Sequence, residues 1–292
     1  MVILIIKPIN TPELIKQVAN VESGVWGEKP EDTVPYHVLT AIEKNGGVLL
    51  GAYDGDQLLG FTLGWLGIVN PDDNIPAEGQ LKLVSHMTGV ITGYRDQRIG
   101  YKLKLAQRDW ALNRGLDLIT WTYDPLESRN AYLNIHLLGC TCQTYHCDIY
   151  GKMSDEINRG TLSDRFGVDW YITREHVINR IDHHKNPKRE NDSIDELLQA
   201  GVKLLNPARF DQKKWPVPVE IEQIIAKERV LVEIPADIQE IRRNDAGISG
   251  DWRHHTRKIF ETLFAEGYLV VDFIFNPGDQ PRSFYLMHKV NL

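Results

Sequence analysis

The sequence predicts a mixed α/β fold, and three stretches of the chain carry that prediction. Residues 90–122 read as a strand, a turn, an amphipathic helix and a second strand. Residues 46–65 alternate around a central Asp-Gly-Asp, which is typical of a β-hairpin. Residues 229–289 show strand, helix and strand patterns again, so a second, smaller α/β domain is expected.

The helix of the first stretch is amphipathic. Ile99, Leu103, Ala106 and Trp110 recur at helical spacing, which places them on one face. We expect the helix to end at Gly115, because glycine adopts the left-handed conformation of a C-terminal cap without steric penalty.

The turn before this helix, residues 95–100, is rich in arginine and glycine. Backbone N–H groups at a helix N-terminus are backed by the positive end of the helix dipole, and together they bind phosphate. Arg95 and Arg98 can add charge-assisted bonds to the same oxygens. The turn is neither a P-loop nor a dinucleotide fingerprint, which leaves the pyrophosphate of another carrier or an ordinary strand-to-helix turn.

At these residues the chain resembles the GNAT superfamily of acyl-CoA-dependent N-acyltransferases. The family signature, Arg/Gln-x-x-Gly-x-Gly/Ala, stands here as RDQRIG (95–100), with Arg98 in place of the first glycine. The strand LVSHMTGVI precedes the turn, and the strand LDLITWTYDP follows the helix. The resemblance covers roughly residues 1–150 and is strongest to a branch with WTYDPL, SRNAYLN and SDRF.

The resemblance implies that acetyl-CoA, or another acyl-CoA, is the cosubstrate. It also implies that the fourth and fifth strands splay apart around the pantetheine arm. Unpaired backbone groups of the fourth strand would bond the arm, and an N–H near Thr88 or Gly89 would stabilise charge on the thioester carbonyl. The residues expected to bind the cofactor are Gly89, Val90, Ile91, Arg95, Asp96, Gln97, Arg98, Ile99, Gly100, Tyr101 and Asn130.

Transfer to an amine needs a group that takes up the amine's proton. His86 lies on the fourth strand, and an ordinary histidine pKa suits this work near neutrality. Asp124, just after the fifth strand, is the second candidate. Both have a structural alternative, because His86 can be hydrogen-bonded within the sheet and an aspartate before proline often forms a turn.

The leaving thiolate needs a proton donor. Many members of the family use a tyrosine four residues before the closing glycine of the next helix, and that position is Ile135 here. Tyrosines nearby in the sequence that can substitute are Tyr132, Tyr145 and Tyr150, of which Tyr145 is the working candidate.

Composition bounds the class of protein. The 292 residues carry a net charge of −7, which argues against nucleic acid as the main partner. The start MVILIIKPIN reads as a strand rather than a signal peptide, and no apolar stretch approaches the ~20 residues that span a bilayer. Three cysteines are too few for a disulfide framework, so a cytoplasmic protein without membrane association is expected.

We expect two domains, residues 1–173 for acyl-CoA binding and residues 174–292 for acceptor specificity or a structural role. Residues 107–125 and 257–277 both run helix, glycine, apolar strand and proline. The second half is therefore either a degenerate copy of the first or another unit with a common α/β pattern.

A long helix is expected from Ser249 to about Gly267, and Arg253 and Arg257 lie one turn apart on it. They can grip a carboxylate of the acceptor or form ion pairs within the protein. The acidic residues expected for such pairs are Glu233, Asp237 and Glu261.

Cysteines and histidines cluster near residue 140, but we expect no metal site. The spacing Cys-x-Cys-x4-Cys matches no common structural zinc site, and residues 142–151 alternate like a strand, which turns side chains to opposite faces. The histidine pairs at 183–184 and 254–255 have no third ligand at useful spacing.

The sequence thus predicts transfer of an acyl group from CoA to the amine of a small molecule, and acetyl is the acyl group expected. The missing tyrosine and the substituted glycine favour an alternative, a non-catalytic acyl-CoA sensor or interaction module. A homodimer is compatible with the sequence, which does not identify the acceptor.

Overall fold

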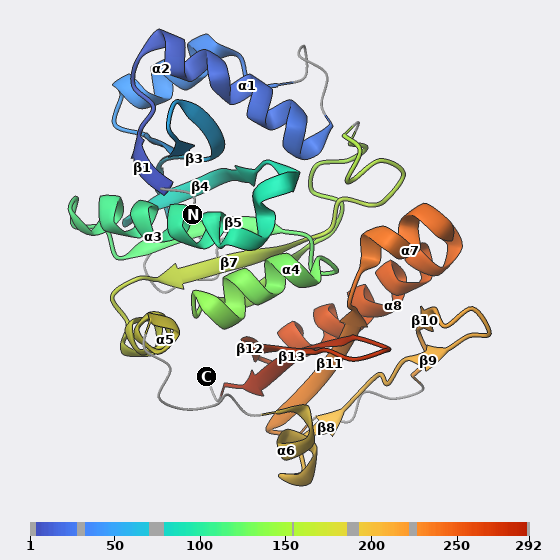
Figure 1. Ribbon diagram of the computed structural model, residues 1–292. Helices are drawn as coiled ribbons and strands as arrows, with labels where there is room; N and C mark the ends of the chain where they lie inside the picture. Colours follow the sequence, from blue (N-terminus) through green and yellow to red (C-terminus); the bar gives the residue numbers. More distant parts are fainter. Residues whose placement is uncertain are drawn as a thin grey trace. The chain divides into compact units, whose positions relative to one another are not determined.

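The computed structural model describes residues 4–27, 33–69, 79–153, 155–185, 193–221 and 227–290. Strands and helices are mixed along these residues, which confirms the predicted α/β class (Figure 1). By packing, the chain divides into two units, residues 1–121 with 152–160 and residues 122–151 with 161–292. Each unit has its own arrangement of strands and helices.

In the first unit the strands lie in the order β1-β2-β3-β4-β5. Neighbouring strands are antiparallel as far as β4, whereas β4 and β5 are parallel. The predicted hairpin around Asp54 is confirmed as β2 and β3. The strands are β1 (Leu4–Pro8), β2 (Val48–Asp54), β3 (Gln57–Ile68), β4 (Leu81–Val90) and β5 (Leu118–Tyr123).

Helices cover both faces of these strands (Figure 1). Apolar side chains of α1 and α2 form one core with Phe61 and Leu63 of β3. On the other face, α3 packs against β2, β3 and β4. The helical segments are α1 (Pro12–Trp26), α2 (Tyr36–Lys44), the 3-10 helix η2 (Thr92–Gln97) and α3 (Ile99–Leu112).

Local sequence explains where α1 and α3 end. Thr11 caps α1 by accepting a hydrogen bond from the Leu14 N–H, and Gly27 follows the helix with a φ of 66°. Gly115 has a φ of 71°, as predicted for the residue that terminates the helical path after α3. Sequence analysis missed α2.

In the second unit the strands lie in the order β7-β6-β12-β13-β11-β8. A separate pair is formed by β9 and β10. The strands are β6 (Thr141–His146), β7 (Arg165–Tyr171), β8 (Lys203–Leu204), β9 (Arg209–Phe210), β10 (Pro216–Val217), β11 (Arg229–Pro235), β12 (Tyr268–Asn276) and β13 (Arg282–Lys289).

Helices of the second unit pack on both faces of β13. Tyr285 contacts Phe260 of α8, while the neighbouring Phe284 belongs to a cluster with Ile194 and Leu197 of α6. Adjacent residues of a strand point to opposite faces, so β13 serves two cores. The helical segments are α4 (Ser128–Ala131), the π-helical η3 (Tyr132–Leu137), α5 (Glu175–Lys185), α6 (Ile194–Gln199), α7 (Ile238–Asn244) and α8 (Ala246–Ala265).

The division by packing does not follow the predicted boundary at residue 173. Residues 122–151 and 161–173 group with the C-terminal residues, because β6 pairs with β12 through Cys142 and Val270. The predicted start of α8 at Ser249 is wrong, because the helix begins at Ala246. Asp245, not Ser249, caps this helix, accepting a hydrogen bond from the Ile248 N–H.

The strands next to the two similar stretches, residues 107–125 and 257–277, pair differently. The strands joined by α3, β4 and β5, are parallel neighbours. The strands on either side of α7 and α8, β11 and β12, each pair with β13, which lies between them. This difference in strand pairing favours a common α/β pattern over a degenerate copy of the first half.

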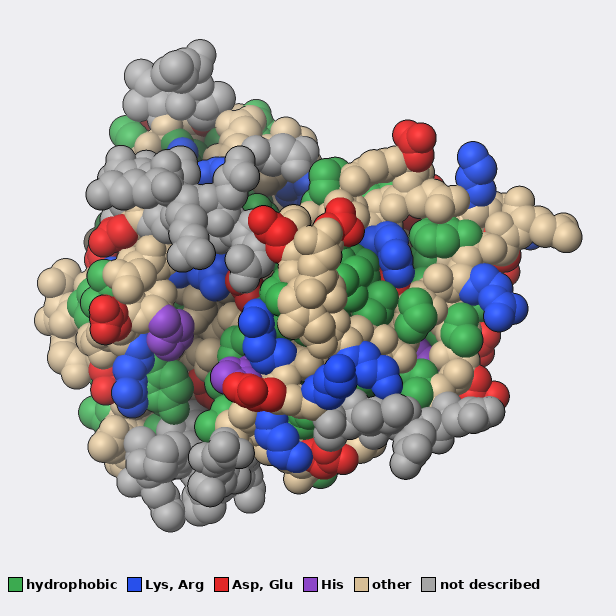
Figure 2. All heavy atoms as spheres, turned by 90° about the horizontal axis from the view of Figure 1, so that it is seen from below, with side chains coloured by type: hydrophobic (Ala, Val, Ile, Leu, Met, Phe, Trp, Pro, Cys, Tyr) green, Lys and Arg blue, Asp and Glu red, His purple; other side chains and the backbone are tan. Residues whose placement is uncertain are grey.

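None of the described helices has the length and apolar character needed to cross a membrane. On the face in Figure 2, Lys and Arg side chains stand among Asp and Glu side chains rather than in one continuous basic surface.

Candidate functional site

Strand β4 carries a β-bulge at His86. Opposite β3, Met87 pairs with Leu63 and Ser85 pairs with Gly64, so His86 is the extra residue. Met87 packs on the core beneath α1 and α2, whereas Ser85 accepts a hydrogen bond from Lys104 of α3. A bulge bends its strand and leaves one residue outside the ladder. The bend therefore lies in the strand predicted to hold the cofactor.

The pairing of β4 with β5 stops just before this bulge. Leu83 is opposite Ile119 and Val84 is opposite Thr120, and those are the described pairs between the two strands. The later residues of β4, from Ser85 to Val90, continue to pair with β3 alone among the described strands. One edge of β4 thus loses its partner, as the predicted splay requires.

The direction of the β4 amides determines which of them face this edge. The Ile91 N–H donates to the Leu59 carbonyl, with N and O 2.9 Å apart, and the Ile91 carbonyl accepts from Tyr94. Because backbone groups alternate along a strand, the Gly89 N–H also points toward β3. The N–H groups of Thr88 and Val90 therefore point to the open edge. Of the three residues expected to bond the pantetheine arm, Gly89, Val90 and Ile91, only Val90 has its N–H group on this edge.

The turn after β4 is a short 3-10 helix followed by Arg98. Arg98 has a φ of 56°, in the left-handed region that glycine enters most easily. It stands at the position of the first glycine in the signature that the sequence resembles. Arg98, at the N-cap position of α3, makes no capping hydrogen bond with its side chain, and the first turn of the helix contains no acidic residue. Among the described side chains, the N-terminal amides of Ile99, Gly100 and Tyr101 therefore have no cap at the N-cap position.

Arg95 makes contacts that the sequence did not suggest. Its Nη2 donates to the Val25 carbonyl near the end of α1 at 3.2 Å, and its Nε to the Val90 carbonyl at 3.4 Å. Arg95 thus ties α1 and β4 to the turn. Gln97 is exposed, and the side chain of Asp96 lies outside the described residues.

The His86 ring packs against Trp65 of β3 in a tilted arrangement, with ring centroids 4.8 Å apart. This partial burial lowers the pKa of His86 below its ordinary value of 6.5. The imidazole is therefore neutral at neutral pH and able to accept a proton.

Gly89 leaves room for an aromatic side chain of α1. A Cβ atom at this position would lie 2.8 Å from the Trp26 ring and 3.2 Å from a Val25 methyl carbon. Trp26 in turn meets Phe61 edge to face. Glycine is needed here for packing, a role different from the predicted contact with the cofactor.

Asp124 lies in the second unit and forms a buried ion pair. Arg253 Nη2 donates to Asp124 Oδ2 at 2.5 Å, and the Leu126 N–H donates to Oδ1 at 2.9 Å. Burial alone would raise the pKa of Asp124, but attraction to Arg253 outweighs it and holds the pKa below 3.8. A carboxylate so stabilised is a poor general base. The structural alternative for Asp124 fits better.

Tyr145 is held in a second ion-pair cluster of the same unit. Its hydroxyl donates to Asp164 Oδ2 at 2.6 Å, and Arg257 donates to both oxygens of that carboxylate. Burial, followed by the bond to Asp164, raises the pKa of Tyr145 well above its ordinary value. Arg253 and Arg257 thus form internal ion pairs, with Asp124 and Asp164 instead of the expected acidic residues.

The helix predicted at residues 128–139 is split into α4 and the π-helical η3. Ile135, at the position of the family's tyrosine, is completely buried. Asn130 is exposed on α4 in the second unit. Asn134, by contrast, is buried.

The cysteine-rich stretch forms β6, as its alternation predicted. Cys140 and Cys142 are buried, whereas Cys147 is exposed. Within the described ranges, no three His, Cys, Asp or Glu side chains lie together as a metal-binding group. The side chains of His183 and His184 lie outside the described residues.

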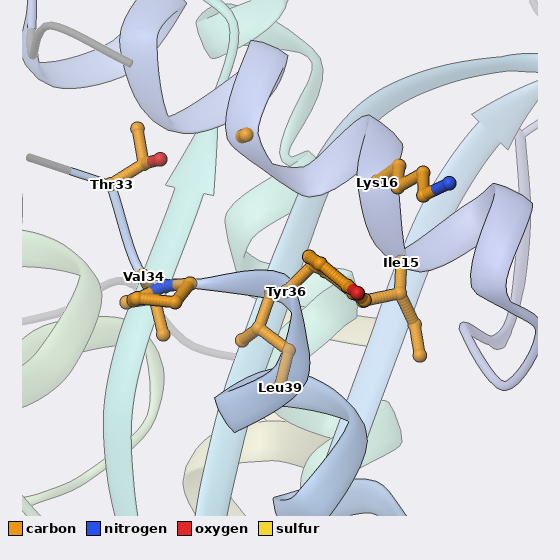
Figure 3. A pocket seen from close by; sticks show the side chains of 8 residues that line it. Ile15, Lys16, Thr33, Val34, Tyr36 and Leu39 are labelled. Atoms are coloured by element: carbon orange, nitrogen blue, oxygen red, sulfur yellow. The ribbon is translucent and has the colours of Figure 1, made fainter. Parts of the chain in front are cut away.

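A hollow of about 340 Å³ opens between α1 and α2 of the first unit. Figure 3 shows Ile15 and Lys16 reaching it from α1, and Tyr36 and Leu39 from α2. Its lining is mostly apolar. It was not foreseen from the sequence, because α2 was missed.

No family model matches the chain, and no curated protein does. Solved structures, however, are similar. Arabidopsis thaliana NAA60 in complex with acetyl-CoA has a TM-score of 0.49 and 13% identity, over 59% of this chain and 99% of that chain. The ribosomal-protein-S18-alanine N-acetyltransferase of Escherichia coli has a TM-score of 0.46 and 12% identity, over 59% and 96%.

Aminoglycoside 6′-acetyltransferase type Ii is also similar, with a TM-score of 0.44 and 20% identity, over 58% of this chain and 98% of that chain. Two of these three structures are named as acetyltransferases.

Proposed function

We propose that the chain binds an acyl-CoA with its first unit and transfers the acyl group to an amine. The observation that carries this proposal is the course of β4. The strand parts from β5 at a bulge and leads through a short turn into α3, whose N-cap residue, Arg98, makes no capping hydrogen bond with its side chain. An open strand edge and a helix N-terminus not capped by Arg98 are thus adjacent in one unit.

The helix end suits the diphosphate. The N–H groups of Ile99, Gly100 and Tyr101 have no intrahelical acceptors, because they precede the first full turn. The positive end of the helix dipole adds to the attraction for anionic oxygens. Arg98 is exposed and supplies a charge beside them. Arg95 acts mainly by fixing the turn through its two carbonyl contacts.

The open edge of β4 suits the amide-containing pantetheine arm. An arm laid along this edge accepts strand-like hydrogen bonds from the N–H groups of Thr88 and Val90. The thioester carbonyl then lies near the bulge, where a backbone N–H stabilises negative charge that develops on oxygen. The bound CoA supplies an activated acyl group, and the protein holds it beside the amine.

His86 is our candidate for the group that takes up the amine's proton. It belongs to the bulge, its imidazole is exposed on one side, and its lowered pKa keeps it neutral. Asp124 and Tyr145 fit their expected roles less well, because both are committed to ion-pair clusters in the second unit. The acceptor we propose is a small-molecule amine.

A non-catalytic acyl-CoA sensor is the second candidate. The burial of Ile135 and the raised pKa of Tyr145 favour it, because neither residue can readily protonate a leaving thiolate.

Two measurements on the purified chain separate these functions. Isothermal titration calorimetry with CoA tests binding, and release of free thiol from acetyl-CoA with a panel of amines tests transfer. Binding with turnover supports the enzyme, and saturable binding without turnover on any amine supports the sensor. If CoA does not bind, both proposals fail.

A further inference from the structure

We propose that Lys104 of α3 positions the open edge of β4 by fixing the point at which β4 parts from β5. The last pair between the strands is Val84 with Thr120. Continuing this register would place Ser85 opposite Trp121, but these two residues are not among the described pairs. Lys104 contacts both of them.

The two contacts are made by one ammonium group. Lys104 Nζ donates to Ser85 Oγ at 2.7 Å and lies 3.6 Å from the centre of the Trp121 ring. A hydroxyl oxygen and the face of an indole are both favourable partners for a cation. The ammonium thus joins β4 and β5 through their side chains at the point where their backbone pairing stops.

The burial of Lys104 makes this arrangement specific. The residue is 3% exposed, and a lysine is rarely so deep unless its charge has partners. Without these two partners, the buried ammonium would lose contacts that offset the cost of removing its charge from water. The charge therefore holds Ser85 and Trp121 at fixed places around it.

The bulge follows at once in the sequence. His86 is the extra residue of β4, next to Ser85. A fixed Ser85 therefore sets the start of the bend and the direction of the Thr88 and Val90 amides. This role rests on the proposed function, in which those amides bind the pantetheine arm while the diphosphate is bound at α3.

The ligand pair that tests this role is CoA and adenosine 3′-phosphate 5′-diphosphate. The second molecule is the nucleotide part of CoA without the pantetheine arm. Calorimetry with both ligands separates an effect on the β4 edge from an effect on the helix end, and it needs no catalysis.

Lys104→Met keeps the length of the side chain and removes the charge. We expect at least a tenfold loss of CoA affinity, with less than a twofold change for the nucleotide. Lys44→Met is the matched control, because Lys44 is 62% exposed in the same unit, and it should change neither affinity. An equal loss for both ligands, or no loss, would show that Lys104 serves only packing.

Ser85→Ala covers the case in which Lys104→Met does not fold. It removes one hydroxyl and leaves the lysine in place over Trp121. We expect a three- to tenfold loss for CoA alone, and an unchanged CoA affinity would refute the proposal. If the wild-type chain binds the nucleotide but not CoA, Lys104 has no arm to position and the inference fails while the helix-end site stands. If it binds neither, the proposed function fails with it.

Discussion

Arg253 of α8 and Asp124, the residue after β5, form an ion pair in which Nη2 and Oδ2 lie 2.5 Å apart and both side chains are almost fully buried. Two further guanidinium nitrogens of Arg253, Nε and Nη1, have no hydrogen-bond partner among the described residues. A buried cation with so few acceptors depends strongly on the one carboxylate it has.

Arg253→Met should destabilise the protein by about 3–5 kcal/mol, because it leaves the Asp124 carboxylate buried without its main counter-charge. The double variant Asp124→Asn with Arg253→Met should be less damaging than the sum of the single variants. Urea unfolding measures both, with the exposed Arg243→Met as control. Additive losses would mean that the pair is not energetically coupled.

Arg98 offers a test of backbone strain at the turn. Because its φ is 56°, Arg98→Gly should be about 1 kcal/mol more stable than Arg98→Ala, since alanine keeps the steric penalty and glycine removes it. Both variants lose the same charge, so they should show similar CoA affinities. Urea unfolding and calorimetry measure the two effects separately. Equal stability of the variants would contradict the strain.

Local patterns in the sequence predicted the hairpin and the strand–turn–helix of the first unit, but neither α2 nor the polar contacts of α3. Ile99 and Leu103 are buried as the spacing predicted, whereas Ala106 and Trp110 of the same predicted face are half-buried. Lys104 and Gln107, which sequence rules place in solvent, are buried on the same helix. Their burial depends on β3, β4 and β5, which lie far away in the sequence.

Only the local part of the candidate site could be predicted from the sequence. The order of strand, turn and helix is local, so residues 90–100 could be recognised. The bulge at His86 and the direction of the Ile91 N–H depend on the pairing of β4 with β3, which no local pattern encodes. The ion pairs of Asp124 and Asp164 join segments more than ninety residues apart.

Asp164 should make the stability of the second unit depend on acid pH. Burial would raise its pKa, but hydrogen bonds from Arg257 and Tyr145 outweigh burial and lower the pKa below 3.8. The ionised Asp164 therefore stabilises the fold fully above pH 3.8, the ordinary aspartate pKa. This stabilisation is lost as the pH falls through the lower pKa that Asp164 has in the folded state. Denaturant unfolding from pH 2.5 to 7 should show that the difference in unfolding free energy between wild type and Asp164→Asn becomes smaller as the pH falls.

The exposed Asp251→Asn is the control for that series, and its gap to wild type should stay nearly constant with pH. A gap for Asp164→Asn that is equally constant would rule out the ionised carboxylate as the source of the stabilisation.

The pH dependence of acyl transfer should follow the protonation of His86. If its neutral imidazole takes up the proton of the amine, kcat/KM rises with pH through an apparent pKa below 6.5 and then levels. This apparent pKa lies below 6.5 because burial against Trp65 lowers the pKa of His86. His86→Gln should remove this limb and lower the rate by about 10²–10⁴-fold. Trp65→Ala uncovers the imidazole, so the limb should move up toward 6.5 while remaining present. Steady-state rates from pH 5 to 8 measure all three, and a limb in His86→Gln identical to that of wild type would assign the proton transfer to another group.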